Sequence, residues 1–284
     1  MRFEKRYAVP TIKAYHTDLL QAVNYLKVHY EIEDPQGISP FHLRSWLAQR
    51  KESGESARTI NRKISTLQSF FKQLLKEGVI YKNPAESMHS LRLPERLPSY
   101  LRETETVDLF QKPIFTEGFE GHTERLMLEL FYQVGLRRNE LLTLKEANVE
   151  WSLKQLRILG KGNKERLIPI KVELLNLIQM YLQEKSLLPK ADSLYLLVLP
   201  SGEPLYAMYV YRKVKLFLSQ ISTLQKRSPH ILRHTFATHL LNNGANIQAI
   251  KDLLGHSSLA ATQIYTHTNI EKLKEIHKLN HPRG

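Results

Sequence analysis

The last quarter of the chain holds three informative stretches: SPHILRHTFATHLL at residues 228–241, LLGHSS at 253–258 and TQIYTHT at 262–268. They bring together four polar residues with complementary chemistry: His230, Arg233, His256 and Tyr265. A tyrosine hydroxyl is a possible nucleophile, a guanidinium is a cation with a fork of donors, and an imidazole donates or accepts protons. No carboxylate cluster typical of a metal site accompanies them in this span. The set therefore suits attack on a phosphodiester without a cofactor.

Each of these residues also has an ordinary structural explanation. Tyr265 is one of thirteen tyrosines, and a single helical tyrosine usually belongs to the edge of a core. His256 follows a glycine and could cap a helix, His230 could be a core imidazole, and Arg233 could form a surface ion pair. The functional interpretation rests on their joint occurrence, because together they occupy positions where apolar residues would otherwise close a core.

The order of residues around Pro229 predicts a helix that begins with an anion site. Ser228 is a good N-cap and Pro229 is favoured in the first helical turn. His230 and Arg233 then stand three residues apart and share one face of the helix. The free N–H groups of a helix start add donors and positive potential at the same place. Both side chains are therefore expected to reach one phosphate.

The charge of the chain favours a polyanionic partner. Lysine and arginine exceed aspartate and glutamate by 13, and the excess is divided between the two halves, with +6 in residues 1–97 and +7 in the remainder. Two basic bodies suit a nucleic acid held between them, whereas a basic tail would suggest a loose tether. The alternative is a solvated basic surface without a specific partner.

Composition also limits the cellular setting. The chain has no cysteine, which excludes disulfides and thiolate metal sites. The N-terminal residues lack the apolar run of a signal peptide, and no segment approaches the roughly 20 apolar residues that span a bilayer. The apolar run SLYLLVLP (193–200) is too short for a span and is interpreted as a buried strand. The expected location is the cytoplasm, with no membrane partner.

The first 90 residues are expected to form helices. Residues 11–30 place Ile12, Tyr15, Leu19, Val23 and Leu26 at helical spacing. A second helix should start at Ser39-Pro40 and end at Gly54, and a third should run from Ser56 to Gly78. The third helix carries five cations and no acid between its first and last basic residues, which favours a DNA-facing surface over an ordinary wet face: Arg58, Arg62, Lys63, Lys72 and Lys76.

The remainder predicts a linker and a second, mixed domain. Residues 91–99 (LRLPERLPS) hold two prolines, which disfavour both helix and central strand. Two alternating stretches, 155–159 and 166–170, joined by GKGNKE, predict a β-hairpin. Helices are expected at about 122–134, 138–146, 171–186, 206–222, 229–243, 247–254, 258–267 and 270–280. The fold class is therefore mainly α with a small antiparallel sheet. The expected domains are a helical core-type DNA-binding domain (1–90), the linker (91–99) and an α+β catalytic domain (100–284).

At this point a family resemblance becomes visible. The segments VGLRRNELLTL, ILGKGNKERLIPI, SPHILRHTFATHLLNNGA and LLGHSSLAATQIYTHTNIEKLKEIHKLNHPRG are similar to the catalytic domain of tyrosine recombinases, specifically the Xer branch. The helical first half resembles the same family more weakly through ARTINRKISTLQSFFKQLLKEGVIYKNPAE. The resemblance covers nearly the whole chain.

The resemblance implies a role for two arginines and one lysine. Arg137 and Arg233 would hold the non-bridging oxygens of the scissile phosphate, with Glu140 as a supporting partner of Arg137. Guanidinium suits this because it stays charged and binds bidentately. The neighbouring Arg138 is expected to point elsewhere. Lys161, in the glycine-flanked turn, would protonate the departing 5′-oxygen, and Lys164 is the competing candidate.

The same resemblance makes Tyr265 the nucleophile. A phenol with pKa about 10 must lose its proton during attack, and His230 is the expected base. His256 would donate a hydrogen bond to a non-bridging oxygen. The implied product is a 3′-phosphotyrosyl enzyme with a free 5′-hydroxyl, formed without metal, ATP or other cofactor.

The resemblance also implies partners and leaves the biological role open. A stripe of Ile270, Leu273, Ile276 and Leu279 would dock on a neighbouring protomer, in a homo- or hetero-tetramer on two DNA duplexes. Resolution of chromosome or plasmid dimers at a dif-like site, with a second recombinase and a septal DNA translocase, is one role, and integration of a mobile element is the other. Rival classes are a type IB topoisomerase, a metal-dependent nuclease and a non-catalytic regulator, since LLNNGANIQAIKDLLG resembles a helix-turn-helix.

Overall fold

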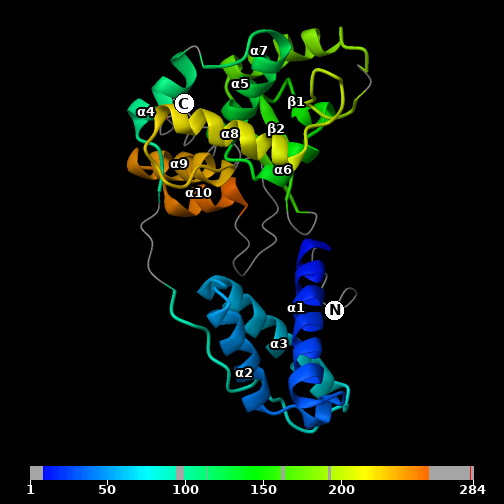
Figure 1. Cartoon of the computed structure of the whole chain (residues 1–284). Helices are drawn as coiled ribbons and strands as arrows, with labels where there is room; N and C mark the ends of the chain where they lie inside the picture. Colours follow the sequence, from blue (N-terminus) through cyan, green and yellow to red (C-terminus); the bar gives the residue numbers. More distant parts are fainter. Residues whose placement is uncertain are drawn as a thin grey trace. The chain divides into compact units, whose positions relative to one another are not determined.

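The structure is a computed structural model that describes residues 9–93, 99–112, 114–160, 164–190, 193–255 and 282. The chain divides into two compact units, Met1–Arg96 and Leu97–Gly284, so the division falls inside the proline-containing segment 91–99. Each unit has its own hydrophobic core. Figure 1 shows a helical first unit and a second unit in which helices surround a small sheet.

The first unit is helical. It contains α1 (Val9–Tyr30), a short 3₁₀ turn (Pro35–Gly37), α2 (Pro40–Glu52) and α3 (Ala57–Lys76). Ser39 and Ser56 cap α2 and α3 by accepting backbone N–H groups, as the sequence predicts. The three helices pack on one another, and the predicted apolar stripe of α3 lies in the core: Ile60, Ile64, Leu67 and Phe71.

Two predictions for this unit are wrong: the exposure of Lys63 and the burial of Val23. Lys63 does not belong to a DNA-facing surface, because it is 2% exposed and its ammonium lies 3.3 Å from the Asp18 carboxylate and 5.2 Å from the Trp46 ring. Asp18 is equally buried and also accepts a hydrogen bond from Arg62 at 2.6 Å. On the same helix, Val23 is 53% exposed rather than part of the core stripe, which instead includes Ala22 and Leu26.

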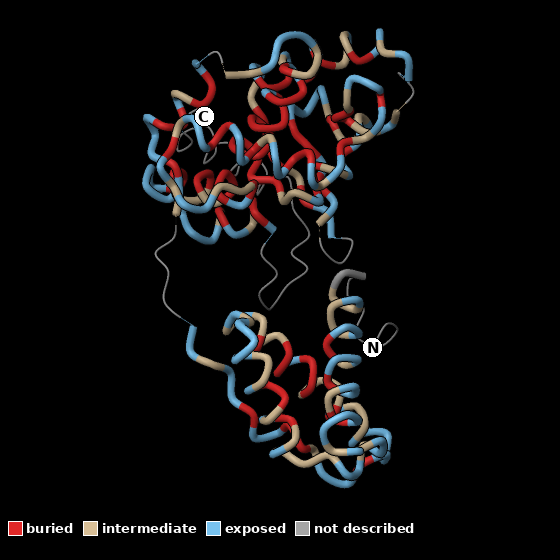
Figure 2. Tube along the Cα trace, in the orientation of Figure 1, coloured by how far each residue is buried: buried red, intermediate tan, exposed pale blue. Residues whose placement is uncertain are grey.

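The second unit is built mainly from helices. These are α4 (Glu103–Gln111), α5 (Gly118–Gln133), α6 (Arg138–Thr143), α7 (Val172–Lys185), α8 (Ala207–Ile221), α9 (Pro229–Asn242) and α10 (Ile247–Leu254). A 3₁₀ turn (Glu146–Asn148) leads into a three-stranded sheet. Helix α5 is buried along most of its length and packs against both α7 and α9, so it is the central helix of this unit (Figure 2).

The sheet contains β1 (Val149–Glu150), β2 (Gln155–Leu159) and β3 (Glu165–Pro169), paired antiparallel in that order. Leu156 pairs with Ile168 and Leu159 with Glu165, so the predicted antiparallel pairing of these two strands is confirmed. One side of the hairpin faces the core through Leu156, Ile158 and Ile168.

Several element predictions differ from the structure. Helix α4 and strand β1 were not predicted, α5 begins at Gly118 rather than 122, and α6 ends at Thr143 rather than 146. The run SLYLLVLP is not a strand of the sheet, since it forms only two isolated bridges, at Tyr195 and Val198, although its central leucines are buried. The predicted helices at 258–267 and 270–280 lie outside the described residues.

The start of the second unit is fastened to α9 by a buried polar network. The Leu101 N–H donates to Thr235 Oγ1 at 3.0 Å, and its carbonyl lies 2.8 Å from His239 Nε2. The other ring nitrogen of His239 lies 3.0 Å from the Tyr132 hydroxyl of α5. Burial lowers the pKa of His239, which keeps the ring neutral at pH 7. Across the described ranges, no helix is both long and apolar enough to cross a membrane.

Candidate active site

Arg233 is a buried cation at the first turns of α9. Pro229 begins this helix after the N-cap Ser228, as predicted, and Arg233 follows one turn later with 8% of its surface exposed. Its guanidinium donates to the carbonyl oxygen of Gly135 at 2.5 Å and to that of Leu254 at 2.6 Å. Burial, together with the charge of Arg137, lowers the pKa of Arg233 to about 9, so the group remains charged at neutral pH.

Arg137 precedes α6 and is fixed by Glu140, the partner that the sequence suggests. The Arg137 backbone N–H donates to Glu140 Oε2 at 2.8 Å, the half of a capping box in which an N3 glutamate serves the N-cap. The Arg137 guanidinium also donates to Glu140 Oε1 at 2.7 Å. Gly135 supplies the tight turn before this arginine: its φ is 64°, and a Cβ there would lie 2.7 Å from Phe236.

The C-terminal turn of α10 is where the arginines converge. Three consecutive backbone carbonyls at this end each accept from a different guanidinium: Leu253 from Arg166 at 2.9 Å, Leu254 from Arg233 at 2.6 Å, and Gly255 from Arg137 at 3.1 Å. The last carbonyls of a helix have no partners within it and carry the negative end of its dipole, so cations suit this position. The turn ends at Gly255 in the left-handed region, directly before His256.

Glu140 is the acid that binds this group of cations. It accepts two hydrogen bonds from Arg166, at 2.9 and 2.7 Å, besides those from Arg137, and Arg233 Nη1 lies 3.8 Å from its Oε2. Burial raises the pKa of Glu140, but the hydrogen bonds and charges of Arg166 and Arg137 outweigh it and hold the pKa at about 2. One carboxylate thus faces three guanidinium groups, which leaves a surplus of positive charge for an anion. We call these four side chains the arginine cluster.

His230 lies at the start of α9 and is exposed, unlike Arg233. Partial burial and the positive charges of Arg138, Arg233 and Arg137 lower its pKa. The ring is therefore neutral at pH 7 and able to accept a proton. The sequence predicts that Arg138 points away from the phosphate, and among the three arginine charges that lower the pKa of His230 that of Arg138 is the largest.

The structure thus brings Arg137 and Arg233 together, and their positive charges help to lower the pKa of His230. Lys161, His256 and Tyr265 lie outside the described residues, as does the stripe from Ile270 to Leu279. Their roles stay predictions. The hairpin that carries Lys161 is described up to Gly160 and again from Lys164, whose side chain is exposed and whose carbonyl accepts from the Gly160 N–H at 2.8 Å.

Sequence reasoning missed Arg166. It is 4% exposed and stands in β3 in phase with the buried Ile168 and Ile170. A charged residue at an inward position of an alternating strand was the available signal, because a buried arginine requires an acidic partner. That partner is Glu140, 26 residues earlier in the chain.

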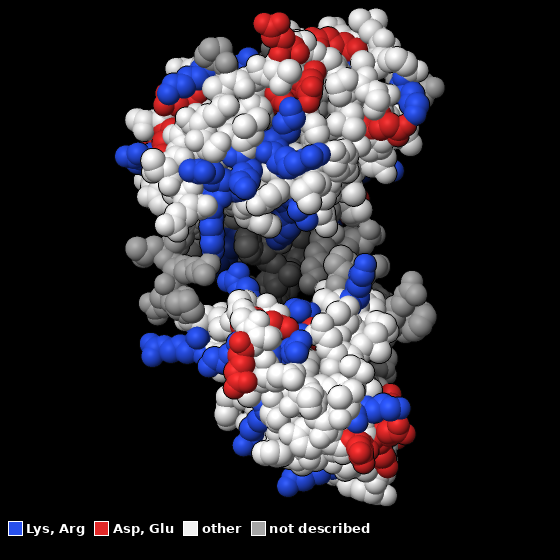
Figure 3. Space-filling view, in the orientation of Figure 1, with Lys and Arg blue, Asp and Glu red and all other residues white. Residues whose placement is uncertain are grey.

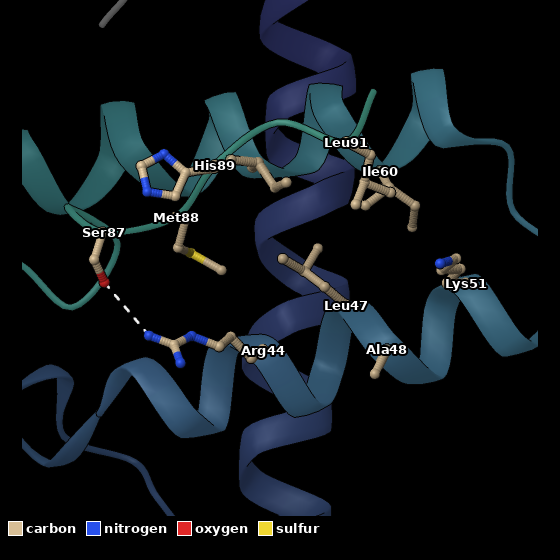
Figure 4. A pocket seen from close by; sticks show the side chains of 10 residues that line it. Arg44, Leu47, Ala48, Lys51, Ile60, Ser87, Met88, His89 and Leu91 are labelled. Atoms are coloured by element: carbon tan, nitrogen blue, oxygen red, sulfur yellow. Dashed lines mark hydrogen bonds between the residues drawn. The ribbon is translucent and has the colours of Figure 1, made fainter. Parts of the chain in front are cut away.

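Two further surface features of the molecule are a group of basic side chains and a pocket. Basic side chains gather over α8, which carries Arg212, Lys213 and Lys215, and they also occur over the first unit (Figure 3). The first unit contains a pocket of about 500 Å³ between α2, α3 and residues 87–91, with an apolar floor and Arg44, Lys51 and His89 at its rim (Figure 4). This pocket contains none of the predicted catalytic residues.

In the described part of the chain, no three His, Asp or Glu side chains lie close enough together to hold a metal ion.

Comparison with known proteins identifies the class. The chain belongs to the phage integrase family, which matches residues 100–272, and the N-terminal SAM-like domain of phage integrases matches residues 1–78. It is a member of the tyrosine recombinases, which are DNA strand-exchange enzymes, and of their Xer branch.

Individual relatives are similar over almost their full length. The chain is 38% identical to the tyrosine recombinase XerC of Listeria monocytogenes, covering 99% of this chain and 94% of that protein. It is 36% identical to the tyrosine recombinase XerD of Proteus mirabilis, covering 99% and 90%. Among solved structures, XerH bound to a palindromic difH substrate, a post-cleavage complex, matches with a TM-score of 0.76 at 24% identity, covering 95% of this chain and 80% of that one. The last likeness bears on the fold, and it agrees with the predicted fold class.

Proposed function

We propose that this tyrosine recombinase cuts and rejoins double-stranded DNA at a specific site through a 3′-phosphotyrosyl intermediate. The arginine cluster is the observation that carries the proposal. Its surplus positive charge suits a phosphate that gains negative charge as it becomes pentacoordinate, and the groups are held in place before the reaction.

Arg137 and Arg233 retain donors for that phosphate. A guanidinium has five N–H groups. Among the described residues, the Arg233 side chain uses two of them, toward Gly135 and Leu254. The Arg137 side chain also uses two, toward Glu140 and Gly255. The remaining donors would bind the non-bridging oxygens bidentately, which a lysine cannot do.

The remaining roles follow from the family resemblance. Tyr265 attacks the phosphorus, neutral His230 accepts the phenolic proton, His256 donates to a non-bridging oxygen, and Lys161 protonates the leaving 5′-oxygen. His256 directly follows the carbonyls that the three arginines hold, so the cluster fixes the point from which this residue starts. One phosphoester replaces another, so the reaction needs no ATP.

We further propose that the chain resolves chromosome or plasmid dimers at a dif-like site, in the cytoplasm, through a Holliday junction. Two pairs of protomers, identical or from two recombinases, would form a tetramer on two duplexes, with a septal DNA translocase as a possible activator. Relatives named XerC and XerD at 30–38% identity over nearly the whole chain support this role. Integration of a mobile element uses the same chemistry and remains the alternative.

A captured-intermediate experiment tests the proposed chemistry. The full-length protein first selects its preferred duplex from random sequence, and versions of that duplex carrying a nick along one strand then serve as suicide substrates. The wild type should form a covalent protein–DNA adduct without added metal, and Tyr265→Phe should form none. An adduct with Tyr265→Phe, or loss of wild-type adduct on chelation, would contradict the proposal, and relaxation of plasmids that lack the selected site would point to a type IB topoisomerase.

A further inference from the structure

The buried Arg166 guanidinium makes three directed hydrogen bonds to two different elements. Its Nη1 and Nη2 donate to the two oxygens of Glu140 at 2.9 and 2.7 Å, a fork-to-fork pair that is almost fully buried. Its Nε donates to the Leu253 carbonyl at 2.9 Å. One planar group therefore joins β3, α6 and the last turn of α10.

The same side chain lies near the two glycines that precede predicted catalytic residues. A Cβ on Gly160, which precedes Lys161, would lie 3.6 Å from Arg166 Nη1. A Cβ on Gly255, which precedes His256, would lie 3.1 Å from Arg166 Cδ. Gly255 also has a φ of 61°, so this position favours glycine for both space and backbone conformation. The added atom would be tight against Arg166 only at Gly255; at Gly160 it would make an ordinary contact with Arg166, and the Lys164 carbonyl oxygen, at 3.2 Å, would be nearer.

Arg166 also helps to hold the Glu140 carboxylate in the orientation in which it accepts from Arg137. Each Glu140 oxygen accepts one hydrogen bond from Arg166 and one from Arg137, so the carboxylate cannot turn without breaking bonds to both. Without Arg166, only the two hydrogen bonds from Arg137 would hold the Glu140 carboxylate, so the positions of this carboxylate and of the Arg137 guanidinium would be less constrained.

We propose that Arg166 is a positioning residue of the recombinase reaction: by holding both Glu140 and the last turn of α10, it fixes Arg137 relative to Arg233 and to Gly255, the residue before His256. This inference rests on the proposed function. Arg166 itself is 4% exposed and is not assigned to the phosphate.

The test compares rates of adduct formation on the nicked selected duplex under single-turnover conditions, using the full chain. The variants are Arg166→Gln, Arg166→Lys and the control Arg157→Gln. Arg157 is the matched control because it lies on the paired strand β2, bonds to a carboxylate of its own, Glu150, and is half-exposed. Melting temperature and the protein concentration that half-saturates the duplex are measured for each protein.

Arg166→Gln is expected to lower the rate at saturating protein by about 10- to 100-fold, the usual effect of removing a group that orients the reacting residues. The half-saturating concentration should stay unchanged, because binding uses other surfaces. Arg166→Lys restores charge to Glu140 but not the fork, so it should recover the melting temperature and leave the rate low. Arg157→Gln should match the wild type.

A double-variant cycle with Glu140→Gln adds a second readout. Because Arg166 acts partly through Glu140, the loss of rate in the double variant should be smaller than the product of the two single losses. Rates of Arg166→Lys equal to wild type, or losses that multiply in the double variant, would overturn the inference. If Arg166→Gln does not fold, the lysine variant decides the question alone. A wild type without any adduct would instead reject the proposed function, so the two failures are distinguishable.

Discussion

Arg233 donates to the carbonyl oxygen of Leu254 at 2.6 Å and so ties α9 to the last turn of α10, two residues before His256. This one bond couples the predicted phosphate-binding arginine to the segment that leads to the next predicted catalytic residue. A substitution at Arg233 would therefore remove the proposed phosphate contacts and the bond to the last turn of α10 together.

Arg233→Lys should reduce the rate of adduct formation by about 10²- to 10³-fold, the effect of losing one fixed donor to a developing oxyanion. A lysine ammonium cannot reach Gly135 and Leu254 at once in the planar geometry of a guanidinium. The measurement is the single-turnover rate on the nicked duplex, with Arg212→Lys on the exposed surface of α8 as the control. Equal rates for the two variants would refute a role for Arg233 in the reaction.

Glu140 should give the protein an acid-sensitive stability. Its folded pKa of about 2 lies below the ordinary 4.5, so its contribution is complete above pH 4.5 and is lost as the pH falls toward 2. A shift of this size corresponds to about 3 kcal/mol. Glu140→Gln should therefore destabilise the second unit by about 3 kcal/mol at pH 7, and the difference from wild type should shrink between pH 4.5 and 2.

Denaturant unfolding at pH 7, 5 and 3 checks this prediction. The control is Asp108→Asn, which removes an exposed carboxylate paired with Lys112 on the surface of α4. A loss of stability for Glu140→Gln that is the same at all three pH values would contradict the assigned ionisation.

Arg138 should set the pH at which His230 works. Besides partial burial, the charge of Arg138 lowers the pKa of His230, which keeps the base neutral to lower pH. Adduct formation should therefore fall on the acid side as His230 becomes protonated. Arg138→Gln should move this acid limb to higher pH, whereas Arg212→Gln should not. A pH–rate profile in which the Arg138 variant keeps the wild-type limb would show that this charge does not act on the base.

Lys63 and Lys72 provide a matched pair within α3. Lys63 is buried against Asp18, so Lys63→Ala should destabilise the first unit by about 3 kcal/mol through an incompletely paired buried charge. Lys72 is exposed, so Lys72→Ala should leave stability unchanged. If this surface of α3 contacts phosphates, Lys72→Ala should also weaken DNA binding. The slope of log binding constant against log salt concentration should then fall by about one unit. Thermal unfolding measures the effect on stability, and DNA titrations over a range of salt measure the effect on binding. A Lys72→Ala variant that loses stability, with a Lys63→Ala variant that does not, would contradict the structural role given to Lys63.

Much of this organisation was predictable from local sequence. Caps at Ser39 and Ser56, the stripe from Ile60 to Phe71 and the antiparallel pairing of β2 with β3 all rest on neighbouring residues. Arg137, His230 and Arg233 are predicted site residues because their motifs are specific, and both arginines donate to carbonyl oxygens at the end of α10.

The errors share a different cause, which is dependence on distant partners. Lys63 is buried together with its partner Asp18, which lies 45 residues away in the sequence. Arg166 is buried together with Glu140, which lies 26 residues away. Neither pairing is visible from periodicity. Strand β1 has only two residues, too few to show alternation, and the run 193–200 is as apolar as a strand although it forms only isolated bridges.

The most direct measurement is the identity of the residue bonded to DNA in the captured adduct. Protease digestion of the wild-type adduct, followed by mass spectrometry of the nucleotide-linked peptide, should find the phosphate on Tyr265 alone among the thirteen tyrosines, attached to a 3′ end. Attachment to another residue, or through a 5′-phosphate, would contradict the account.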